Sequence, residues 1–283
     1  MIVSEVSENA EIGETREIVR YLPTRGAFPV PDQFDLYALA LAADDYNAVF
    51  PGTLNSPVRD ADSFFQVLTE KGRQRAGKKP FFNLRHDAQL FNERLNLREF
   101  GKELGILKQK LKAARPEDLL VVLLVGHGEI APGSDRYYFL PSSVRNRAMV
   151  ADEGFSWERL APLTELPCRK LFVIDTCHAG QALPSLIDEL KKRDCLVMCS
   201  SAADQKAAET NYSQDPNLPD WHMIYLNQFI RGLKDGTADL SEDGEISLWE
   251  CAQAVERFED LPSTGFHEPW DLFQVLDIPL AHK

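Results

Sequence analysis

The sequence lacks any apolar run of the roughly 20 residues needed to cross a bilayer. Its first 18 residues, MIVSEVSENAEIGETREI, are polar and acidic and contain no apolar segment like that of a secretory signal peptide. Basic residues are outnumbered, because 31 lysines and arginines stand against 44 aspartates and glutamates and leave a net charge of −13. We therefore expect a cytoplasmic protein that binds neither nucleic acid nor membrane and attracts basic partners.

Cysteine is also scarce and is not arranged in close sets. The chain has five cysteines, which are Cys168, Cys177, Cys195, Cys199 and Cys251. An odd count without metal-type spacing argues against a disulfide framework and against a zinc site. The run CLVMC at 195–199 has the composition of a strand, so we interpret its two cysteines as core residues.

The chain is rich in apolar sequence that alternates between strand-like and helical patterns. With 283 residues and 44% apolar content, one domain can bury a substantial core, and two smaller domains are also compatible. Continuous apolar runs at 119–125 and 171–174 are typical of parallel strands covered on both faces. We assign residues 1–33 to a leader or linker of unknown structure and residues 34–283 to the domain.

Capping signals place several helices between these runs. Ser56 and Pro57 begin a helix that ends at Gly72, and Asn96, with Glu99 three residues later, begins another. Further helices are expected at 156–166, 183–192, 222–234 and 248–258, and further strands at the start of 36–46, near 81–82, at 137–141 and at 195–199. This alternation predicts an α/β fold.

Two short motifs follow the two apolar runs directly. His127 lies in GHG at 126–128, and Cys177 lies in DTCHAG at 175–180. Because reacting groups collect at the carboxyl ends of parallel strands, we expect His127 and Cys177 to meet in space. A thiol with a pKa of about 8.5 is mostly protonated at neutral pH, so an imidazole beside it would supply the base for nucleophilic attack. The alternative is a structural cysteine and an unrelated, hydrogen-bonded histidine.

The residues around these motifs are similar to those of a known family. An acid two residues before the nucleophile, the segment LYALALAADDY at 36–46, Asp60-Ala61 and Asp204-Gln205 resemble the prokaryotic metacaspase-like (orthocaspase) branch of the caspase-fold cysteine peptidases. The resemblance implies a three-layer α/β/α sandwich around a mostly parallel six-stranded sheet. It also implies a cysteine endopeptidase with Cys177 as nucleophile and His127 as base, and with the backbone amides of Gly128 and Cys177 as oxyanion donors.

The same resemblance implies a substrate class. An acid at position 175 resembles the pocket of metacaspases that cleave after arginine or lysine, so Asp175, Asp60 and Asp204 are the candidate specificity residues. Arg59 stands where that family usually has Asn. A structural alternative is that Asp60 supports a helix N-terminus and Asp175 caps a turn. At the level of the whole protein, the alternative to a peptidase is a non-catalytic caspase-fold module that binds a partner; the sequence names no regulatory partner.

The sequence indicates no required cofactor, although one segment resembles a calcium site. Calcium-dependent metacaspases carry an acidic DGxDE-like run and an Asp seven residues after the nucleophile, whereas this chain has no such run and has Pro184 at that place. Residues 239–250 fit an EF-hand loop except at the third position. Its candidate calcium ligands are Asp239, Ser241, Asp243, Glu245 and Glu250.

A peptidase with basic specificity could also cleave itself. The segment 71–79 contains five basic residues among turn-forming ones, and Arg145-Asn146-Arg147 is a second basic loop. We expect self-cleavage in one of these two segments.

Overall fold

The computed structural model describes residues 2–5, 18–21, 33–47, 50–73, 80–182, 195–201, 206–213, 220–256 and 279–282. The strands are β1 (Ile2–Glu5), β2 (Ile18–Tyr21), β3 (Phe34–Ala42), β4 (Phe82–Phe91), β5 (Leu119–Gly126), β6 (Gly128–Ile130), β7 (Tyr137–Phe139), β8 (Phe155–Ser156), β9 (Arg169–Thr176), β10 (Cys195–Cys199), β11 (Glu209–Asn211), β12 (Trp221–Met223), β13 (Glu245–Ser247) and β14 (Pro279–His282). The α-helices are α1 (Pro57–Arg73), α2 (Leu97–Lys110), α3 (Val150–Glu153), α4 (Trp157–Leu160), α6 (Ile224–Asp235) and α7 (Leu248–Glu256). None of these described helices is long and apolar enough to span a membrane.

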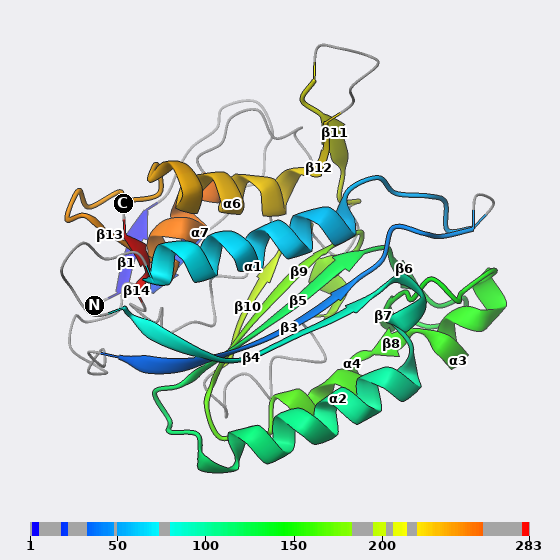
Figure 1. Ribbon diagram of the computed structural model, residues 1–283. Helices are drawn as coiled ribbons and strands as arrows, with labels where there is room; N and C mark the ends of the chain where they lie inside the picture. Colours follow the sequence, from blue (N-terminus) through cyan, green and yellow to red (C-terminus); the bar gives the residue numbers. More distant parts are fainter. Residues whose placement is uncertain are drawn as a thin grey trace.

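The centre of the molecule is a parallel sheet with helices on both faces. Its strands pair in the order β10-β9-β5-β3-β4, and every pairing is parallel. Helices α1, α6 and α7 cover one face, and α2 and α4 cover the other (Figure 1). This confirms the three-layer α/β/α sandwich expected from the sequence.

The expected number of six strands is not found in the described residues, where the central sheet has five. After β10 the described strands are three or four residues long and form antiparallel pairs, β11 with β12 and β13 with β14. A parallel strand buried on both faces needs a continuous apolar run, and segments such as Glu209–Asn211 do not supply one.

The continuous apolar runs of the sequence form the buried strands of the core. Every residue of β5 and β9 is buried, and so are eight of the nine residues of β3. The helices pack aromatic side chains on this sheet and on one another. Phe64 of α1 lies 5.3 Å from Phe229 of α6, and Trp157 of α4 lies 5.4 Å from Phe172 of β9, between ring centroids.

Two elements differ from the sequence prediction. The short strand expected near Phe81 is the ten-residue β4, whose sequence FNLRHDAQLF alternates polar and apolar residues. β4 lies at the edge of the sheet, so one of its faces stays partly exposed and the apolar run is interrupted. The helix expected over 156–166 is only α4 followed by a 3₁₀ turn at Ala161–Leu163, and Pro162 in that turn has no amide hydrogen to continue the helix.

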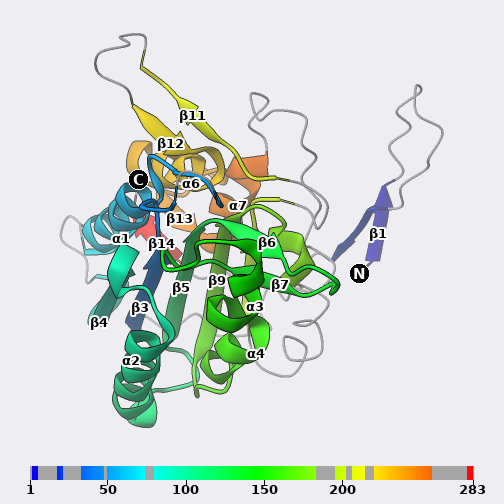
Figure 2. The ribbon, with the colours of Figure 1, turned by 90° about the vertical axis from the view of Figure 1, so that its right-hand side faces the viewer.

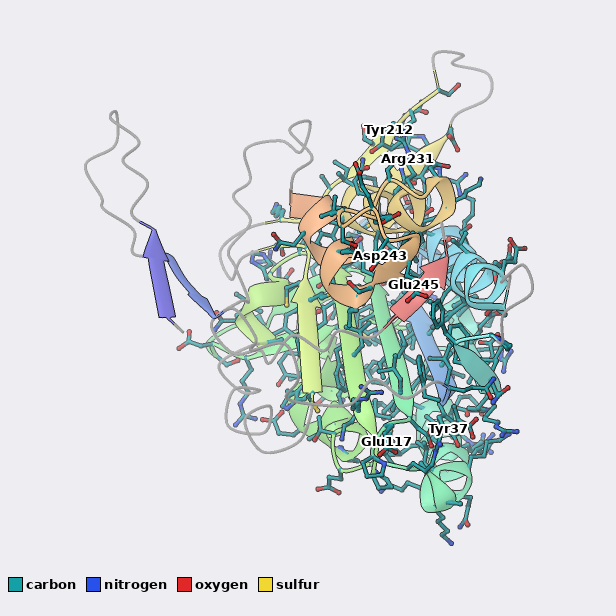
Figure 3. All side chains as sticks on the ribbon, turned by 90° about the vertical axis from the view of Figure 1, so that its left-hand side faces the viewer. Tyr37, Glu117, Tyr212, Arg231, Asp243 and Glu245 are labelled. Atoms are coloured by element: carbon teal, nitrogen blue, oxygen red, sulfur yellow. The ribbon has the colours of Figure 1, made fainter. Side chains whose placement is uncertain are left out.

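Small sheets lie at the carboxyl edge of the central sheet. β6, β7 and β8 form an antiparallel sheet directly after β5, and the β11–β12 hairpin projects from the same end (Figure 2). Figure 3 shows Tyr212 of this hairpin at the opposite end of the molecule from Tyr37 and Glu117, which lie near the starts of β3 and β5. In the segment expected to be a leader, β1 pairs with β2 in antiparallel fashion.

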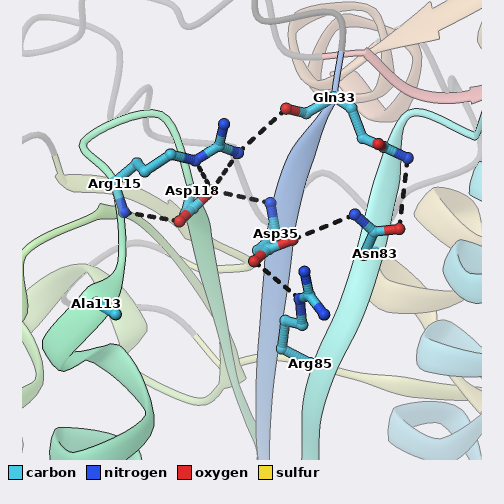
Figure 4. Close-up of a pocket in the computed structure, with 7 residues that line it drawn as sticks. All are labelled: Gln33, Asp35, Asn83, Arg85, Ala113, Arg115 and Asp118. Carbon is cyan, nitrogen blue, oxygen red and sulfur yellow. Dashed lines mark hydrogen bonds and ion pairs between the residues drawn. The ribbon is translucent and has the colours of Figure 1, made fainter.

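A hollow of about 560 Å³ lies at the amino-terminal end of the strands (Figure 4). Its charges satisfy one another: Arg85 pairs with Asp35 at 2.8 Å, and Arg115 pairs with Asp118 at 2.9 Å. Asp118 also accepts the Asp35 backbone amide, which joins β3 to the start of β5. We therefore interpret this hollow as a polar network that closes the end of the sheet, away from the candidate active site.

Candidate active site

The two motifs identified in the sequence lie side by side at the carboxyl edge. His127 directly follows β5 and Cys177 directly follows β9, and these strands are neighbours in which Gly126 pairs with Thr176. The residues next along each strand, His127 and Cys177, therefore emerge at the same edge although they are fifty positions apart in the sequence.

Gly128 brings the two strand ends into contact. A β-carbon at this position would overlap the Cys177 carbonyl oxygen, so only glycine fits here without a shift of the backbone. Gly128 pairs with Phe139 of β7, while the Leu140 amide donates to the His127 carbonyl. In this antiparallel register the Gly128 amide points away from β7. It is therefore not used by the β6–β7 ladder.

Two neighbours fix the His127 ring. Its Nε2 lies 2.8 Å from the Gly52 carbonyl oxygen, which can only accept a hydrogen bond, so Nε2 carries the proton and Nδ1 has the lone pair. The Tyr46 hydroxyl accepts the His127 backbone amide at 3.1 Å and donates to the Leu140 carbonyl at 2.8 Å. The Tyr46 and His127 rings meet edge to face with centroids 4.8 Å apart. The imidazole is thus held in one tautomer.

The surroundings of His127 favour its neutral form. Burial lowers the pKa of the imidazole below its usual value, against the opposing effects of the Gly52 carbonyl and the negative charges of Glu209 and Glu129. A neutral imidazole with a lone pair on Nδ1 is the form that can accept a proton.

The Cys177 thiol is protonated in its surroundings. Burial raises its pKa above the usual value, and the hydrogen bond with the Ala207 backbone and the positive charge of Lys206 oppose this effect only in part. Its Sγ donates a weak hydrogen bond to the Ala207 carbonyl at 3.7 Å. The hydrogen bonds described for this region do not include one between Cys177 and His127, a contact that in unliganded enzymes often forms only with substrate.

The turn after Cys177 is anchored by a serine that follows β10. The Ser201 hydroxyl accepts the Ala179 amide at 3.0 Å and donates to the Thr176 carbonyl at 2.9 Å. The Gly180 amide donates to the Ser201 carbonyl at 2.9 Å. His178, next to Cys177, has φ +59°, in the left-handed region that non-glycine residues rarely adopt. The tight turn after β9 is held by these bonds.

Asp175 lies below the N-terminus of α6 and is 1% exposed. Its carboxylate accepts the Leu226 amide at 3.0 Å, so it caps a helix that is distant in the sequence. Burial, with a smaller contribution from the negative charges of Asp60 and Glu209, raises the pKa of Asp175 to about 7. Asp60 and Glu209 therefore lie close enough to Asp175 for their negative charges to act on it.

Asp60 is completely buried in the first turn of α1. One carboxylate oxygen is 2.6 Å from His222 Nδ1, and the other accepts the Met223 amide at 2.7 Å. Burial raises the pKa of Asp60, and the interactions with His222 and the Met223 amide offset only part of this rise. Asp60 thus joins α1 to β12. The third candidate of the pocket, Asp204, lies outside the described residues.

The carboxylates of the EF-hand-like segment contact its own backbone. Glu250 accepts one hydroxyl and three amide hydrogen bonds, from Ser247 Oγ, Leu240 N, Ser241 N and Ser247 N. Asp239 accepts the Asp243 and Gly244 amides at 3.2 Å each. Ser241 and Asp243 are exposed and Glu245 is partly exposed. In the part of the chain that the structure describes, no three His, Cys, Asp or Glu side chains are grouped to hold a metal ion.

Sequence reasoning missed several residues that shape this site. Tyr46 lies in a segment that we assigned to the first strand and its loop, but nothing local indicates that its hydroxyl reaches His127. Gly52 follows a proline and looks like an ordinary turn residue. Ser201 and Glu209 lie in stretches with no motif. Their roles depend on contacts between segments more than 70 positions apart or, for Ser201, between neighbouring strands, which no local pattern reveals.

The fold is a three-layer α/β/α sandwich, and a histidine and a cysteine lie at the carboxyl edge of its parallel sheet. These features define the class as α/β proteins with a candidate cysteine–histidine site. The chain belongs to the caspase-domain family: the family model described as the caspase domain (Peptidase_C14) matches residues 36–257. Both candidate residues lie within the matched range. No curated protein matches the chain significantly.

One solved structure agrees with this fold. Protein GSU0716 from Geobacter sulfurreducens is similar with a TM-score of 0.51 and 16% identity, over 88% of this chain and 100% of that one. At this identity the likeness concerns the fold alone. Pro-Sf-caspase-1 is similar with a lower TM-score of 0.46 and 12% identity, over 91% of this chain and 99% of that one.

Proposed function

We propose that this protein is a cysteine endopeptidase in which Cys177 is the nucleophile and His127 the general base. The observation that carries the proposal is the 2.8 Å contact between His127 Nε2 and the Gly52 carbonyl oxygen. Because a carbonyl oxygen only accepts, the proton belongs on Nε2 and Nδ1 is the basic atom. The family match supports a peptidase that acts on protein substrates.

The reaction begins with a neutral pair. His127 Nδ1 takes the thiol proton as Cys177 Sγ attacks the peptide carbonyl, and the carbonyl oxygen becomes an oxyanion. The C–N bond then breaks, and the proton passes from His127 to the leaving amine. Water, deprotonated by the same imidazole, hydrolyses the thioester and restores the thiol. The raised pKa of Cys177 makes the base necessary, because the thiol alone is protonated at neutral pH.

The oxyanion is stabilised by the backbone amides of Gly128 and Cys177. The register of β6 leaves the Gly128 amide outside the ladder, and the contact of Gly128 with the Cys177 carbonyl puts it beside the nucleophile. Amides that are fixed before the reaction stabilise developing charge without reorganisation.

Substrates are cleaved after arginine or lysine. Asp175 and Asp60, with Asp204 as the third acid of the pocket, provide the negative charge. The pKa of Asp175 is raised by burial and by neighbouring negative charge, and a bound guanidinium would relieve both effects. Arginine is preferred over lysine because its planar fork forms two hydrogen bonds with a carboxylate.

A peptidyl electrophile that ends in arginine tests the nucleophile. We expect it to add its mass to Cys177 of the wild type and not to Cys177→Ala, and we expect both Cys177→Ala and His127→Ala to lose cleavage of an arginine peptide. Circular dichroism confirms that the variants fold. Cleavage by Cys177→Ala at the wild-type rate would exclude this mechanism.

Matched peptides with Arg, Lys or Asp before the scissile bond test the pocket. We expect the order Arg, then Lys, with no cleavage after Asp, because two like charges about 4 Å apart repel by roughly 4 kcal/mol at an effective dielectric near 20. Asp175→Ala should lose the preference, and Asp152→Ala, at an exposed position on α3, should keep it. An unchanged preference in Asp175→Ala would place the specificity elsewhere.

The proposed chemistry requires no metal. Activity should survive a calcium chelator, since the acidic run of calcium-dependent metacaspases is missing. Loss in chelator and recovery with calcium would show that calcium acts at the Asp239–Glu250 segment or at another site. The acidic charge balance supports a cytoplasmic location.

A caspase-fold module that binds partners without catalysis is the second candidate. The raised pKa of Cys177 favours it, because burial keeps the thiol protonated. The arginine electrophile separates the two, since a binding module would leave Cys177 unmodified.

A further inference from the structure

Glu209 makes an unusual set of contacts with a distant segment. Its carboxylate accepts the backbone amides of Asn55, at 2.9 and 3.1 Å to its two oxygens, and of Ser56, at 2.8 Å. It also accepts Asn55 Nδ2 at 3.1 Å and the Ser56 hydroxyl at 2.7 Å. One side chain of β11 therefore holds the residues that lead into α1, which are more than 150 positions earlier in the sequence.

The segment held by Glu209 also carries the carbonyl that fixes His127. Gly52 is three residues before Asn55, and its carbonyl accepts His127 Nε2 at 2.8 Å. On its other side this segment is tied by the Gly52 amide to the Asn47 carbonyl at 3.1 Å. The Leu54 amide donates to the Asp44 carbonyl at 3.3 Å, and the Leu54 side chain packs against the core, so Glu209 is one of several contacts that hold this segment.

The residues just before Glu209 touch the other half of the dyad. The Ala207 carbonyl accepts the Cys177 thiol at 3.7 Å. Residues 207–209 therefore contact Cys177 directly and reach His127 through the segment 52–56.

We propose that Glu209 is a positioning residue, which holds residues 52–56 so that the Gly52 carbonyl keeps His127 in the tautomer with a basic Nδ1. The effect on His127 is independent of the peptidase reaction, whereas the effect on catalysis rests on the proposed function. Glu209 does not bind substrate through its carboxylate, because five donor contacts already occupy a group that offers about four lone-pair sites.

Substitutions can separate the effect of the Glu209 charge from the effect of its side-chain length. Glu209 and Glu129 both act by their negative charge on His127. Glu209→Gln removes charge and acceptor sites, and Glu209→Asp keeps the charge on a shorter side chain that cannot reach both amides. Glu129→Gln is the matched control, because it removes a similar charge but no hydrogen bond to residues 52–56 is described for it.

Nitrogen NMR of ring-labelled histidine tests the proposal without relying on activity. The spectra are recorded in the Cys177→Ala background, and the His127 signal is assigned by its loss in His127→Gln. We expect Glu209→Gln and Glu209→Asp to mix the two tautomers of His127, and Glu129→Gln to keep the Nε2–H form. An unchanged tautomer signature in folded Glu209→Gln and Glu209→Asp would overturn the proposal, whatever the enzyme's activity.

Kinetics of the same substitutions in the active protein give the second readout. We expect kcat to fall about tenfold to a hundredfold for both Glu209 variants, with KM for the arginine peptide within about twofold, because misplacement of a catalytic group by ~1 Å can cost a hundredfold.

Should Glu209→Gln fail to fold, Glu209→Asp and Ser56→Ala are measured in its place, and we expect a smaller loss of kcat for Ser56→Ala. Wild-type kcat in all of them would contradict a positioning role. Inactivity of the wild type would exclude the proposed function and leave the NMR result to decide on Glu209.

Discussion

At the scale of single residues, the space around Gly128 decides whether the two strand ends can meet. Atoms that a β-carbon would approach include Thr176 Oγ1 and Tyr137 Cε2, each at 2.7 Å, besides the Cys177 carbonyl. The Cys177 carbonyl oxygen belongs to the backbone, so rotation of a side chain cannot relieve this contact. Gly128 therefore couples the backbone geometry of Cys177 to that of the residue after His127.

We predict that Gly128→Ala lowers kcat/KM by about a hundredfold or more, because the Cys177 backbone must shift by a sizeable fraction of an ångström. Gly105→Ala is the control, since Gly105 is exposed on α2 with no atom within 4 Å of a β-carbon. It should keep full activity and gain about 0.5–1 kcal/mol of stability. Steady-state kinetics and urea unfolding of both variants measure the effects. Full activity in Gly128→Ala would show that this contact is unimportant.

The buried carboxyl of Asp175 gives a pH prediction. Its pKa is raised to about 7 from an ordinary value of 3.8, so the folded protein binds this proton more tightly than the unfolded chain does. The contribution of Asp175 to stability should therefore fall as the pH rises from about 4 to about 7 and stay low above that. Asp175→Asn removes the titration and should gain stability relative to the wild type between pH 5 and pH 8.

Urea unfolding of the two proteins at several pH values measures this difference. A guanidinium guest requires the ionised carboxylate, so binding of an arginine peptide to the wild type should strengthen as the pH rises through about 7. A difference between wild type and Asp175→Asn that does not change with pH would show that Asp175 keeps an ordinary pKa.

At the scale of elements, Asp60 joins α1 to the β11–β12 hairpin. Its carboxylate is 2.6 Å from His222 Nδ1 and 2.7 Å from the Met223 amide, and Met223 directly precedes α6. A single carboxylate thereby links two helices that pack on the same face of the sheet. Part of the role that we expected at the substrate pocket is therefore structural.

We predict that Asp60→Ala lowers the free energy of unfolding by about 1–3 kcal/mol, because the buried Met223 amide loses its acceptor. Asp62→Ala, on the same helix but partly exposed, should cost less. Urea unfolding measures both. Equal losses in the two variants would mean that the Asp60 contacts contribute little to stability.

At the scale of the whole molecule, the proposed preference for basic residues predicts self-cleavage at exposed basic segments of this chain. Arg145 and Arg147 are exposed, and the Arg147 guanidinium lies 5.9 Å from the centre of the Phe50 ring. Most of the other candidate segment, 71–79, lies outside the described residues. We predict fragments that end after a basic residue in one of these segments. Intact-mass spectrometry of the wild type beside Cys177→Ala measures this; identical masses after long incubation would refute self-cleavage.

The sequence by itself determined the architecture and the place of the candidate site. Continuous apolar runs such as 119–125 can only be buried on both faces, so they form parallel strands covered by helices. The carboxyl ends of such strands share one edge, and this follows for His127 and Cys177 without coordinates. The EF-hand-like ligand set, by contrast, stays a prediction.

Tertiary structure alone decided how the site is held. The tautomer of His127 depends on Gly52, the burial of Asp175 depends on the start of α6, and the segment 52–56 depends on Glu209. It also decided the length of β4 and the five strands of the described sheet. Apolar periodicity reports only whether a residue faces the core. Hydrogen bonds between distant segments depend on the distance and direction of single polar atoms, which the fold sets and local sequence does not encode.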